Sequence, residues 1–280
     1  MKQLFNNIQV GLVRFSFVVF CIVLSPLLFV NAFFHRRRVK KAPFHKSLIV
    51  ALCDKYPLAY QLYNFVMGFP LFDRVYAVLP QLNGRVLQVG CGTGALNIYL
   101  KRHRNADDIE LHNLDTNLKS INYGLKRRNF DTYIHGDICK VPFEKEYFDA
   151  IVFARCFHHI RSPKKAFAEC SRLLSGEGRI IICDVISLSA TDPEHSYMMN
   201  SNFDGLIWRY TEKAFKAHIE KYLPPDLELT QLELVRQKHV TNYNLFYPHT
   251  DVVAVLKKRA LQSEKNSKIT YNKKYDDRED

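Results

Sequence analysis

A glycine-rich stretch, RVLQVGCGTGALN at residues 85–97, constrains the fold of this chain more than any other feature. Apolar residues lead into glycines at three alternate positions, and a helix-forming sequence follows them. This pattern predicts a strand, a tight turn and then a helix. Because glycine has no side chain, such a turn lets a ligand approach the bare backbone. The stretch therefore predicts a ligand site at the end of a strand.

Strand-like and helical runs alternate along the chain after this stretch. Such alternation predicts a parallel sheet with helices on both faces. The last two strand-like runs lack a helix between them, which predicts an antiparallel final strand. We therefore expect an α/β fold with a doubly wound, Rossmann-like sheet of seven strands. The expected strands are residues 85–90, 109–115, 132–137, 148–155, 179–187, 227–237 and 250–258, and the expected helices are 95–103, 118–129, 162–174 and 211–223, the last two capped by Ser162 and Thr211.

An uncharged run, residues 15–34, precedes the alternating part. Its 20 residues are the length needed to cross a bilayer core, and it lacks the cleavage pattern of a signal peptide. Residues 35–46 follow with six Lys and Arg and no acid, which predicts that the folded domain is cytosolic. Pro26 leaves open a kinked helix that enters one leaflet only. We expect a transmembrane or membrane-inserted helix, single-pass or monotopic, whose basic flank contacts lipid headgroups.

These features divide the chain into an N-terminal segment, an anchor, a basic juxtamembrane linker, a folded domain and a charged tail expected to be disordered. Half of the net charge of +12 lies in the basic segment 35–46, so we expect no nucleic-acid partner. The seven cysteines form no CxxC pair, which predicts reduced thiols and no metal site. The five parts are residues 1–14, 15–34, 35–55, 56–257 and 258–280.

The glycine turn is compatible with more than one ligand. No GxxxxGK sequence is present, which excludes a P-loop. Gly90, Gly92 and Ala95 fit the dinucleotide pattern G-x-G-x-x-A, and Asp115, 20 residues beyond Ala95, would bind a ribose. Gly94 adds a third alternate glycine, which widens the approach to the backbone. The dehydrogenase alternative requires this extra glycine to be coincidental.

A further motif, HGDICKVPF, follows the third expected strand. Asp137 would accept a hydrogen bond from the exocyclic amine of adenine, and Ile138 would pack on the ring. With these motifs in this order, residues 80–190 resemble the class I S-adenosylmethionine-dependent methyltransferases, in the broad group that includes quinone and sterol methyltransferases. The resemblance extends weakly to about residue 257.

The resemblance implies that S-adenosylmethionine is the cofactor. The turn would hold its methionine part, Asp115 its ribose, and the Asp137 and Ile138 pair its adenine. The family usually has Asp or Glu where this chain has Gln88, which accepts a hydrogen bond but carries no charge. The full set of expected cofactor-binding residues is Gln88, Gly90, Cys91, Gly92, Gly94, Asp115, Thr116, Asp137, Ile138 and Arg155.

The implied chemistry is methyl transfer by in-line displacement. An acceptor that must lose a proton needs a base, and the candidate catalytic residues are His158 and His159 after the fourth strand. Either histidine is equally compatible with capping the next helix or lining the pocket. Residues 188–211 are expected to close over the acceptor, with an aromatic wall of Tyr197, Trp208 and Tyr210.

The expected function is therefore methylation of a small lipophilic acceptor, such as a phenol or quinone precursor, at the cytosolic membrane face. A membrane-anchored thiol methyltransferase and a phospholipid N-methyltransferase are alternatives with the same layout. A scaffold that binds the cofactor, or nothing, without catalysis is a further alternative. The oligomeric state is left open.

Overall fold

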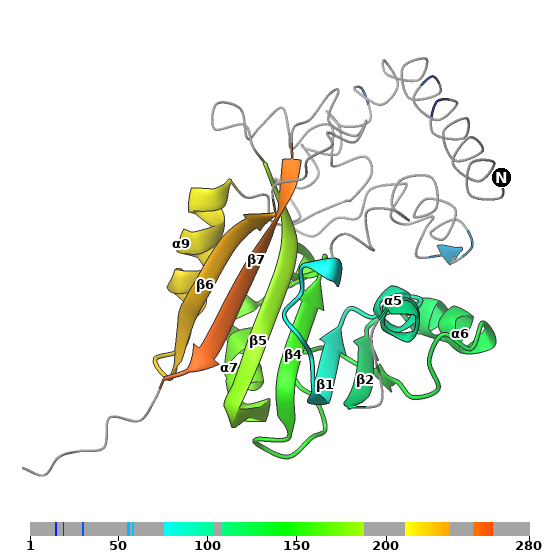
Figure 1. The fold of residues 1–280 in the computed structure, drawn as a ribbon, viewed down its shortest axis with the longest axis horizontal. Coiled ribbons are helices and arrows are strands. Elements are labelled where there is room, and N and C mark those ends of the chain that lie inside the picture. The colour runs from blue at the N-terminus through cyan, green and yellow to red at the C-terminus, as the bar shows by residue number, and fades with distance from the viewer. Residues whose placement is uncertain are drawn as a thin grey trace, which may run out of the picture.

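The computed structural model describes residues 76–103, 108–187, 211–235 and 249–259, with six further positions: Phe15, Val19, Val30, Lys55, Tyr56 and Leu58. One seven-stranded sheet organises this part, in the order β3-β2-β1-β4-β5-β7-β6 (Figure 1). The neighbours among β3, β2, β1, β4 and β5 pair in parallel, and β7 runs antiparallel to both β5 and β6. The predicted doubly wound sheet with an antiparallel last strand is confirmed. Its strands are β1 Gly84–Val89, β2 Ile109–Asp115, β3 Ile134–His135, β4 Phe148–Ala154, β5 Leu174–Ser187, β6 Leu227–Val235 and β7 His249–Lys258.

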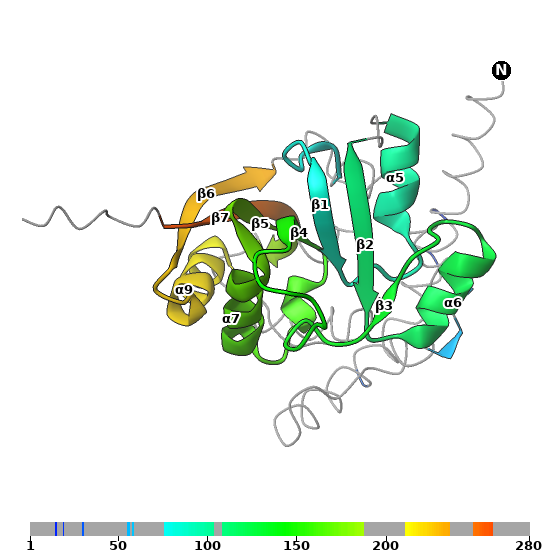
Figure 2. The ribbon, with the colours of Figure 1, turned by 90° about the horizontal axis from the view of Figure 1, so that it is seen from below.

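Helices cover both faces of the sheet because successive strand residues point to opposite faces. Leu87 belongs to a core cluster with Phe167 of α7 and Phe215 of α9. Its neighbour Val86 belongs to a second cluster with Leu96 of α5. Figures 1 and 2 show α7 and α9 together, apart from α5 and α6. The helices are α5 Ala95–His103, α6 Leu118–Lys126, the 3₁₀ turn η1 Phe157–His159, α7 Pro163–Leu173 and α9 Glu212–Tyr222.

The strand order brings the predicted site segments to one edge. β1 pairs with β2 on one side and with β4 on the other, so the winding reverses at β1. In parallel sheets, the loops at the carboxyl ends of the strands on either side of such a reversal form the ligand-binding crevice. The glycine turn after β1 and the segments after β2, β3 and β4 all leave the sheet at this edge.

Several expected boundaries were wrong, among them the end of α6, which lies at Lys126 instead of at residue 129. β5 begins at Leu174, and residues 175–178, expected to form a turn after the helix, belong to the strand. The register between β4 and β5 shifts between Phe148 and Ala150, which accommodates the added strand residues. β3 is confined to Ile134–His135 instead of the expected six residues.

The two expected helix caps differ in outcome. Thr211 caps α9 as predicted, because its side chain accepts a hydrogen bond from the Ala214 amide. Ser162 holds the N-cap position of α7, but its side chain makes no capping hydrogen bond. Pro163 at the first helical position supplies the pre-set backbone angle that begins this helix.

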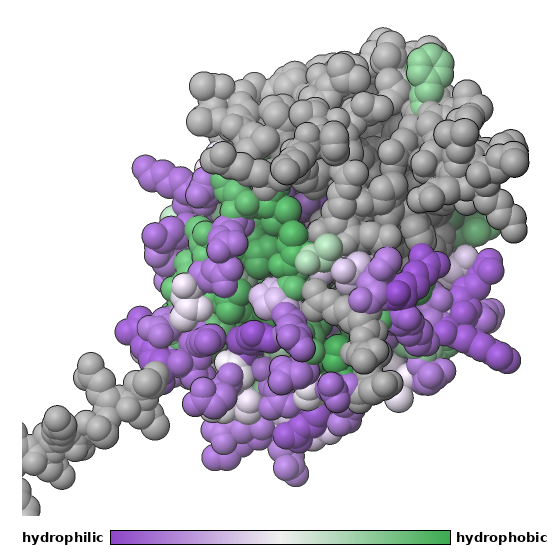
Figure 3. Space-filling view, viewed as in Figure 1, coloured by the Kyte–Doolittle hydropathy of each residue, from purple (hydrophilic) through white to green (hydrophobic). Residues whose placement is uncertain are grey.

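Several predictions fall on residues outside the described part. These are the substrate wall of Tyr197, Trp208 and Tyr210, the tail after residue 259, and all of the anchor except Phe15, Val19 and Val30. Within the part that is described, no helix has the length and apolar character needed to span a membrane. In the view of Figure 3, hydrophobic side chains gather over β6, β7 and β5, with hydrophilic ones to their left and below them.

Helix α6 ends in a left-handed turn that reverses the chain. The Arg128 amide donates to the Leu125 carbonyl at 2.9 Å, and the Asn129 amide donates to the Gly124 carbonyl at 3.0 Å. Together these two bonds form a Schellman motif, in which the residue after the cap is left-handed and usually glycine. Here that residue is Arg128, with φ 56°.

Replacing Arg128 with glycine removes this backbone strain. A left-handed non-glycine residue costs about 1–2 kcal/mol, and glycine recovers part of that after its own entropic cost. We expect Arg128→Gly to raise the free energy of unfolding by about 0.5–1 kcal/mol, measured by urea denaturation. Arg127→Gly is the matched control, because Arg127 is right-handed with φ −90° and gains nothing from glycine. Equal or lower stability of Arg128→Gly than of the parent would contradict this.

Candidate active site

The glycine turn after β1 has the conformation that the sequence predicted. Its three glycines have positive φ, and the turn is tied to β2 because the amides of Gly90 and Cys91 donate to the Leu114 carbonyl at 2.8 and 3.0 Å. A Cβ at Gly90 would lie 2.7 Å from the Cys156 Cβ, so a larger residue there displaces the turn or the segment after β4. The φ angles are 70° at Gly90, 56° at Gly92 and 90° at Gly94.

The Asp115 carboxylate, at the end of β2, lies beside this turn. One oxygen accepts a hydrogen bond from the Gly92 amide at 2.7 Å, and the other from the Asn117 amide at 2.8 Å. The carboxylate therefore joins the ends of β1 and β2. Thr116 is exposed at the same edge, with its carbonyl 3.2 Å from His135 Nε2.

Gln88 places a buried acceptor beneath the turn. The residue is 2% exposed, and its Oε1 has no hydrogen-bond partner among the described residues. Gln88 is in register with Asn113 of β2, whose Oδ1 is also without a partner in that part of the chain. Such an acceptor is costly to bury unless a donor reaches it, which favours a ligand with a donor group at this position.

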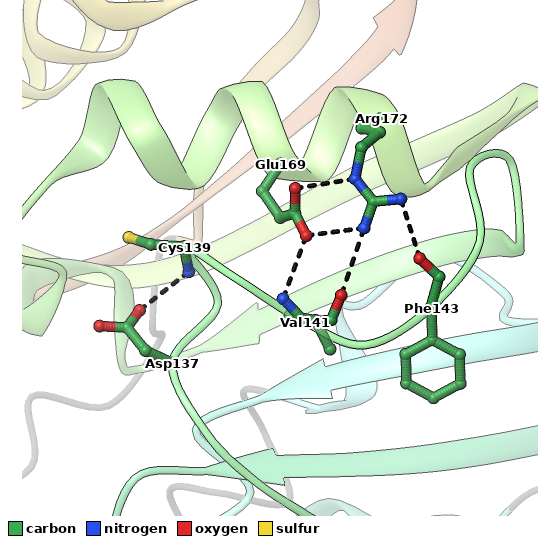
Figure 4. A network of polar contacts seen from close by, with 6 residues as sticks. All are labelled: Asp137, Cys139, Val141, Phe143, Glu169 and Arg172. Carbon is green, nitrogen blue, oxygen red and sulfur yellow. Dashed lines mark hydrogen bonds and ion pairs between the residues drawn. The ribbon is translucent and has the colours of Figure 1, made fainter.

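The segment after β3 presents one polar side chain at the edge. Asp137 is exposed, and one of its oxygens accepts a hydrogen bond from the Cys139 amide at 2.9 Å (Figure 4). Ile138 is 2% exposed and packs in the core cluster, so the group it offers at the edge is its backbone. Its role in packing on an adenine ring stays a prediction.

An ion pair on α7 holds the chain that follows Asp137. The Arg172 guanidinium lies 2.7 Å from Glu169 and donates to the carbonyls of Phe143, at 2.8 Å, and Val141, at 3.3 Å. Glu169 accepts from the Val141 amide at 3.1 Å (Figure 4). The hydrogen bond from Arg172 holds the pKa of Glu169 below its usual value. The charged pair thus fixes the loop leading from the third strand to the fourth.

Arg155, at the end of β4, makes an ion pair with β7. Its Nη2 lies 2.6 and 2.8 Å from the two oxygens of Asp251, which is fully buried. Its backbone is left-handed, with φ 55°, and its amide donates to the Cys183 carbonyl at 2.7 Å. Burial is the largest single influence and lowers the pKa of Arg155, but the charge of Asp251, the hydrogen bond to it and smaller contributions together raise the pKa above its usual value, so the guanidinium stays protonated. The structure shows Arg155 bound to Asp251; its expected cofactor contact stays a prediction.

The two histidines of the predicted catalytic pair lie together in η1. Their ring centroids are 4.1 Å apart, and His159 is exposed while His158 is 3% exposed. His158 Nδ1 lies 2.6 Å from one oxygen of Asp184, and the other oxygen accepts from the His158 amide at 2.8 Å. Asp184 is fully buried on β5, so it fixes both the ring and the backbone of His158.

Sequence reasoning missed Asp184 and Asp251. Both stand inside apolar strand runs, RIIICDVIS and TDVVAVLKK. A carboxylate in such a run must find a cation or hydrogen-bond donors when it is buried. An acidic residue within an apolar strand sequence was therefore a signal for a buried polar contact, although it does not identify the partner residues.

Five of the seven cysteines lie in the described part, and all five are free thiols. Burial, and then the charge of Asp115, raises the pKa of Cys91. Burial also raises the pKa of Cys139, to about 12. These two thiols are therefore protonated and unreactive near neutral pH. In the same part of the chain, His, Cys, Asp and Glu side chains form no group of three suited to a metal ion.

With this geometry described, the central part of the chain can be compared with known families. Residues 87–182 match the family described as methyltransferase domain. This segment is similar to that family. The matched segment includes the glycine turn, Asp115, Asp137 and the histidine pair.

Curated relatives agree with the family match. The chain is 30% identical over 136 residues to a demethylmenaquinone methyltransferase of Thermotoga maritima, which covers 48% of this chain and 58% of that protein. It is 26% identical over 119 residues to a sterol 24-C-methyltransferase of Kluyveromyces lactis, covering 40% and 32% of the two chains. The chain thus spans between a third and three fifths of these relatives.

Solved structures share the fold. A Thermotoga maritima protein described as an S-adenosylmethionine-dependent methyltransferase, possibly a histamine N-methyltransferase, has a TM-score of 0.55 at 17% identity, covering 76% of this chain and all of that one. Geranyl diphosphate C-methyltransferase from Streptomyces coelicolor, solved with S-adenosyl-L-homocysteine, has a TM-score of 0.51 at 13% identity, covering 68% and 80%. The two structures are therefore similar to this chain in fold.

Removing the charge of Asp251 leaves Arg155 without its buried partner. Breaking a buried ion pair from one side costs about 3 kcal/mol or more. We expect Asp251→Asn to lower the free energy of unfolding by about 3 kcal/mol in urea denaturation. The control is Glu146→Gln, because the Lys258–Glu146 pair is 3.6 Å long with Glu146 57% exposed. That change should cost less than about 1 kcal/mol, and equal losses in the two variants would refute the assignment.

Proposed function

We propose that this chain is an S-adenosylmethionine-dependent methyltransferase that acts on a small lipophilic acceptor at a membrane face. The observation that carries the proposal is the Asp115 carboxylate bound to the Gly92 amide at the edge where β1 and β2 end. The family match to residues 87–182 supports it. The relatives that act on demethylmenaquinone and sterols support the lipophilic acceptor, since both are lipid-soluble molecules.

The residues at the sheet edge fit the cofactor of this family. Gln88 Oε1 has no partner among the residues that the structure describes, and it can accept a hydrogen bond from a donor such as the cofactor's ammonium group although it carries no charge. The glycine turn, including Cys91, would hold the amino-acid end through its backbone. Asp115, with Thr116 beside it, would hold the ribose. Asp137 and the backbone of Ile138 would hold the adenine.

The bound cofactor would supply a methyl group on a sulfonium, open to in-line displacement. The protein's part is alignment and, for an acidic acceptor, proton removal. The hydrogen bond to Asp184 requires the His158 proton on Nδ1, so proton exchange by this ring would run through Nε2. His159 is the second candidate base, because it is exposed beside the first.

The membrane part of the proposal rests on the sequence. Residues 15–34 carry no charge, and residues 35–46 carry six basic side chains. Phe15, Val19 and Val30 within that run are exposed by 68%, 42% and 55%. Exposed apolar side chains of this size suit a lipid environment. We propose a single-pass or monotopic anchor with the methyltransferase domain in the cytosol.

One structural observation disfavours the dehydrogenase alternative. The dinucleotide-binding fold has the order 3-2-1-4-5-6 with parallel strands. Here the antiparallel β7 lies between β5 and β6. A non-catalytic scaffold is the alternative that the same fold allows, and a binding measurement tests it.

The decisive experiment is calorimetric titration of the full chain with S-adenosylmethionine and S-adenosylhomocysteine. We expect both to bind, and Asp115→Ala to weaken both about 10- to 100-fold, because a charged acceptor is lost. Asp131→Ala, an exposed carboxylate on the turn after α6, is the control and should bind as the parent does. Absence of binding to the folded parent would refute the proposed function. Binding without methylation of any lipophilic acceptor would favour the scaffold.

The anchor is tested by fractionation of cells that express the full chain. We expect the protein to remain with membranes after washing at high salt and at alkaline pH, since apolar insertion is independent of charge. Replacing Val19, Val23 and Leu27 with Asp should release it, because a charge in the bilayer core costs about 3 kcal/mol each. Replacing Lys40 and Lys41 with Gln is the control and should leave it in place. Release of the parent by salt alone would contradict an inserted helix.

A further inference from the structure

The chain that follows α6 makes a close contact with the glycine turn. Asn129 Nδ2 donates a hydrogen bond of 2.6 Å to the carbonyl of Thr93, which lies between the second and third glycines. Thr93 is 3% exposed, so this carbonyl is shielded from water. The contact spans 36 residues of sequence and therefore fixes one segment against another.

Phe130 fills the space next to this hydrogen bond. Its side chain packs with Cys91 and Ile121 in a small core cluster of their own. A Cβ built at Gly94 would lie 2.6 Å from the Phe130 ring, and one built at Gly124 would lie equally close. The ring is therefore held between the glycine turn and helix α6, with glycine required on both sides.

The left-handed end of α6 directs both residues at the turn. Arg128 reverses the chain, so that Asn129 and Phe130 point back toward the end of β1. Lys101 of α5 donates to the Arg128 carbonyl at 3.4 Å, which links the reversal to the helix that follows the turn. The glycine turn and α5 are thus both in contact with the end of α6.

From this geometry we propose that Asn129 and Phe130 are positioning residues for the cofactor: they hold the glycine turn in its binding conformation before the ligand arrives. The inference rests on the proposed function, because it concerns the affinity of the same site. Neither residue touches the cofactor in this proposal; both act through Thr93 and Gly94.

The physical reason is the conformational freedom of the turn. Three glycines at alternate positions populate many backbone conformations, and ordering them on binding costs entropy. A turn that is already fixed by a hydrogen bond and a packed ring avoids that entropic cost, so the ligand binds more tightly. Loss of the Asn129 hydrogen bond or of the Phe130 ring should therefore lower the affinity for ligands that contact the turn more than the affinity for ligands that do not.

The test compares two ligands by calorimetry on the full chain. S-adenosylhomocysteine has the amino-acid end that the turn would hold, whereas 5′-methylthioadenosine lacks it. We expect Asn129→Ala to raise the Kd of S-adenosylhomocysteine about five- to tenfold, the worth of one hydrogen bond. Asn129→Asp should raise it further, because a carboxylate would face the Thr93 carbonyl. The Kd of 5′-methylthioadenosine should change less than about twofold in both variants, since it does not reach the turn.

The controls separate the possible failures. Asn122→Ala, an exposed residue on α6, should leave both Kd values unchanged. If Asn129→Ala proves unstable, Phe130→Leu provides a second variant that keeps the core apolar, and it should show the same selective loss. Equal weakening of the two ligands, or parent-like binding of S-adenosylhomocysteine by the variants, would overturn the inference. Failure of the parent itself to bind would instead refute the proposed function, and the inference with it.

Discussion

The hydrogen bond between the Gly92 amide and the Asp115 carboxylate is the contact on which the arrangement of the site depends. It joins two loops that leave adjacent parallel strands, and it sets an acidic group beside a turn of bare backbone. Because one partner is charged, this bond is shorter and stronger than an ordinary amide contact. The sheet itself then positions the segments after β3 and β4, because β3 pairs with β2 and β4 pairs with β1. The position that we propose for the cofactor site thus follows from the strand order and from one charged side chain.

A second set of contacts fixes the other half of the same edge. Two fully buried carboxylates, Asp184 and Asp251, hold His158 and Arg155. They come from neighbouring antiparallel strands, so the sheet keeps them close to each other and to the end of β4. A buried carboxylate is stable only with such partners. These buried carboxylates therefore hold the segment that carries the candidate bases, while His159 remains exposed.

The strands and the glycine turn could be predicted because their signals are local. Alternation of apolar residues located β2 at Ile109–Asp115 with both ends correct, and three alternate glycines located the turn. The partners of Asp184 and Asp251 could not be predicted from the sequence. They lie 26 and 96 residues away along the chain, and the strand order decides which residues meet. The left-handed conformation of Arg128 had no signal either, since glycine or asparagine usually takes that position. The local sequence pattern therefore predicted the position of the glycine turn, and the pairing of distant strands decided which side chains support it.

The position of β7 also affects how the domain is made. β7 is the final strand of the sheet in sequence, yet it lies between two strands that precede it. While a ribosome is still synthesising residues 249–258, β5 and β6 have no common partner, and β5 offers an unpaired edge to other chains. Asp251 arrives with the same strand, so the charge of Arg155 is unmatched until then. The β5, β7 and β6 part of the sheet is thus completed only after residues 249–258 have been synthesised, and chaperone binding to the nascent chain would act on this exposed edge.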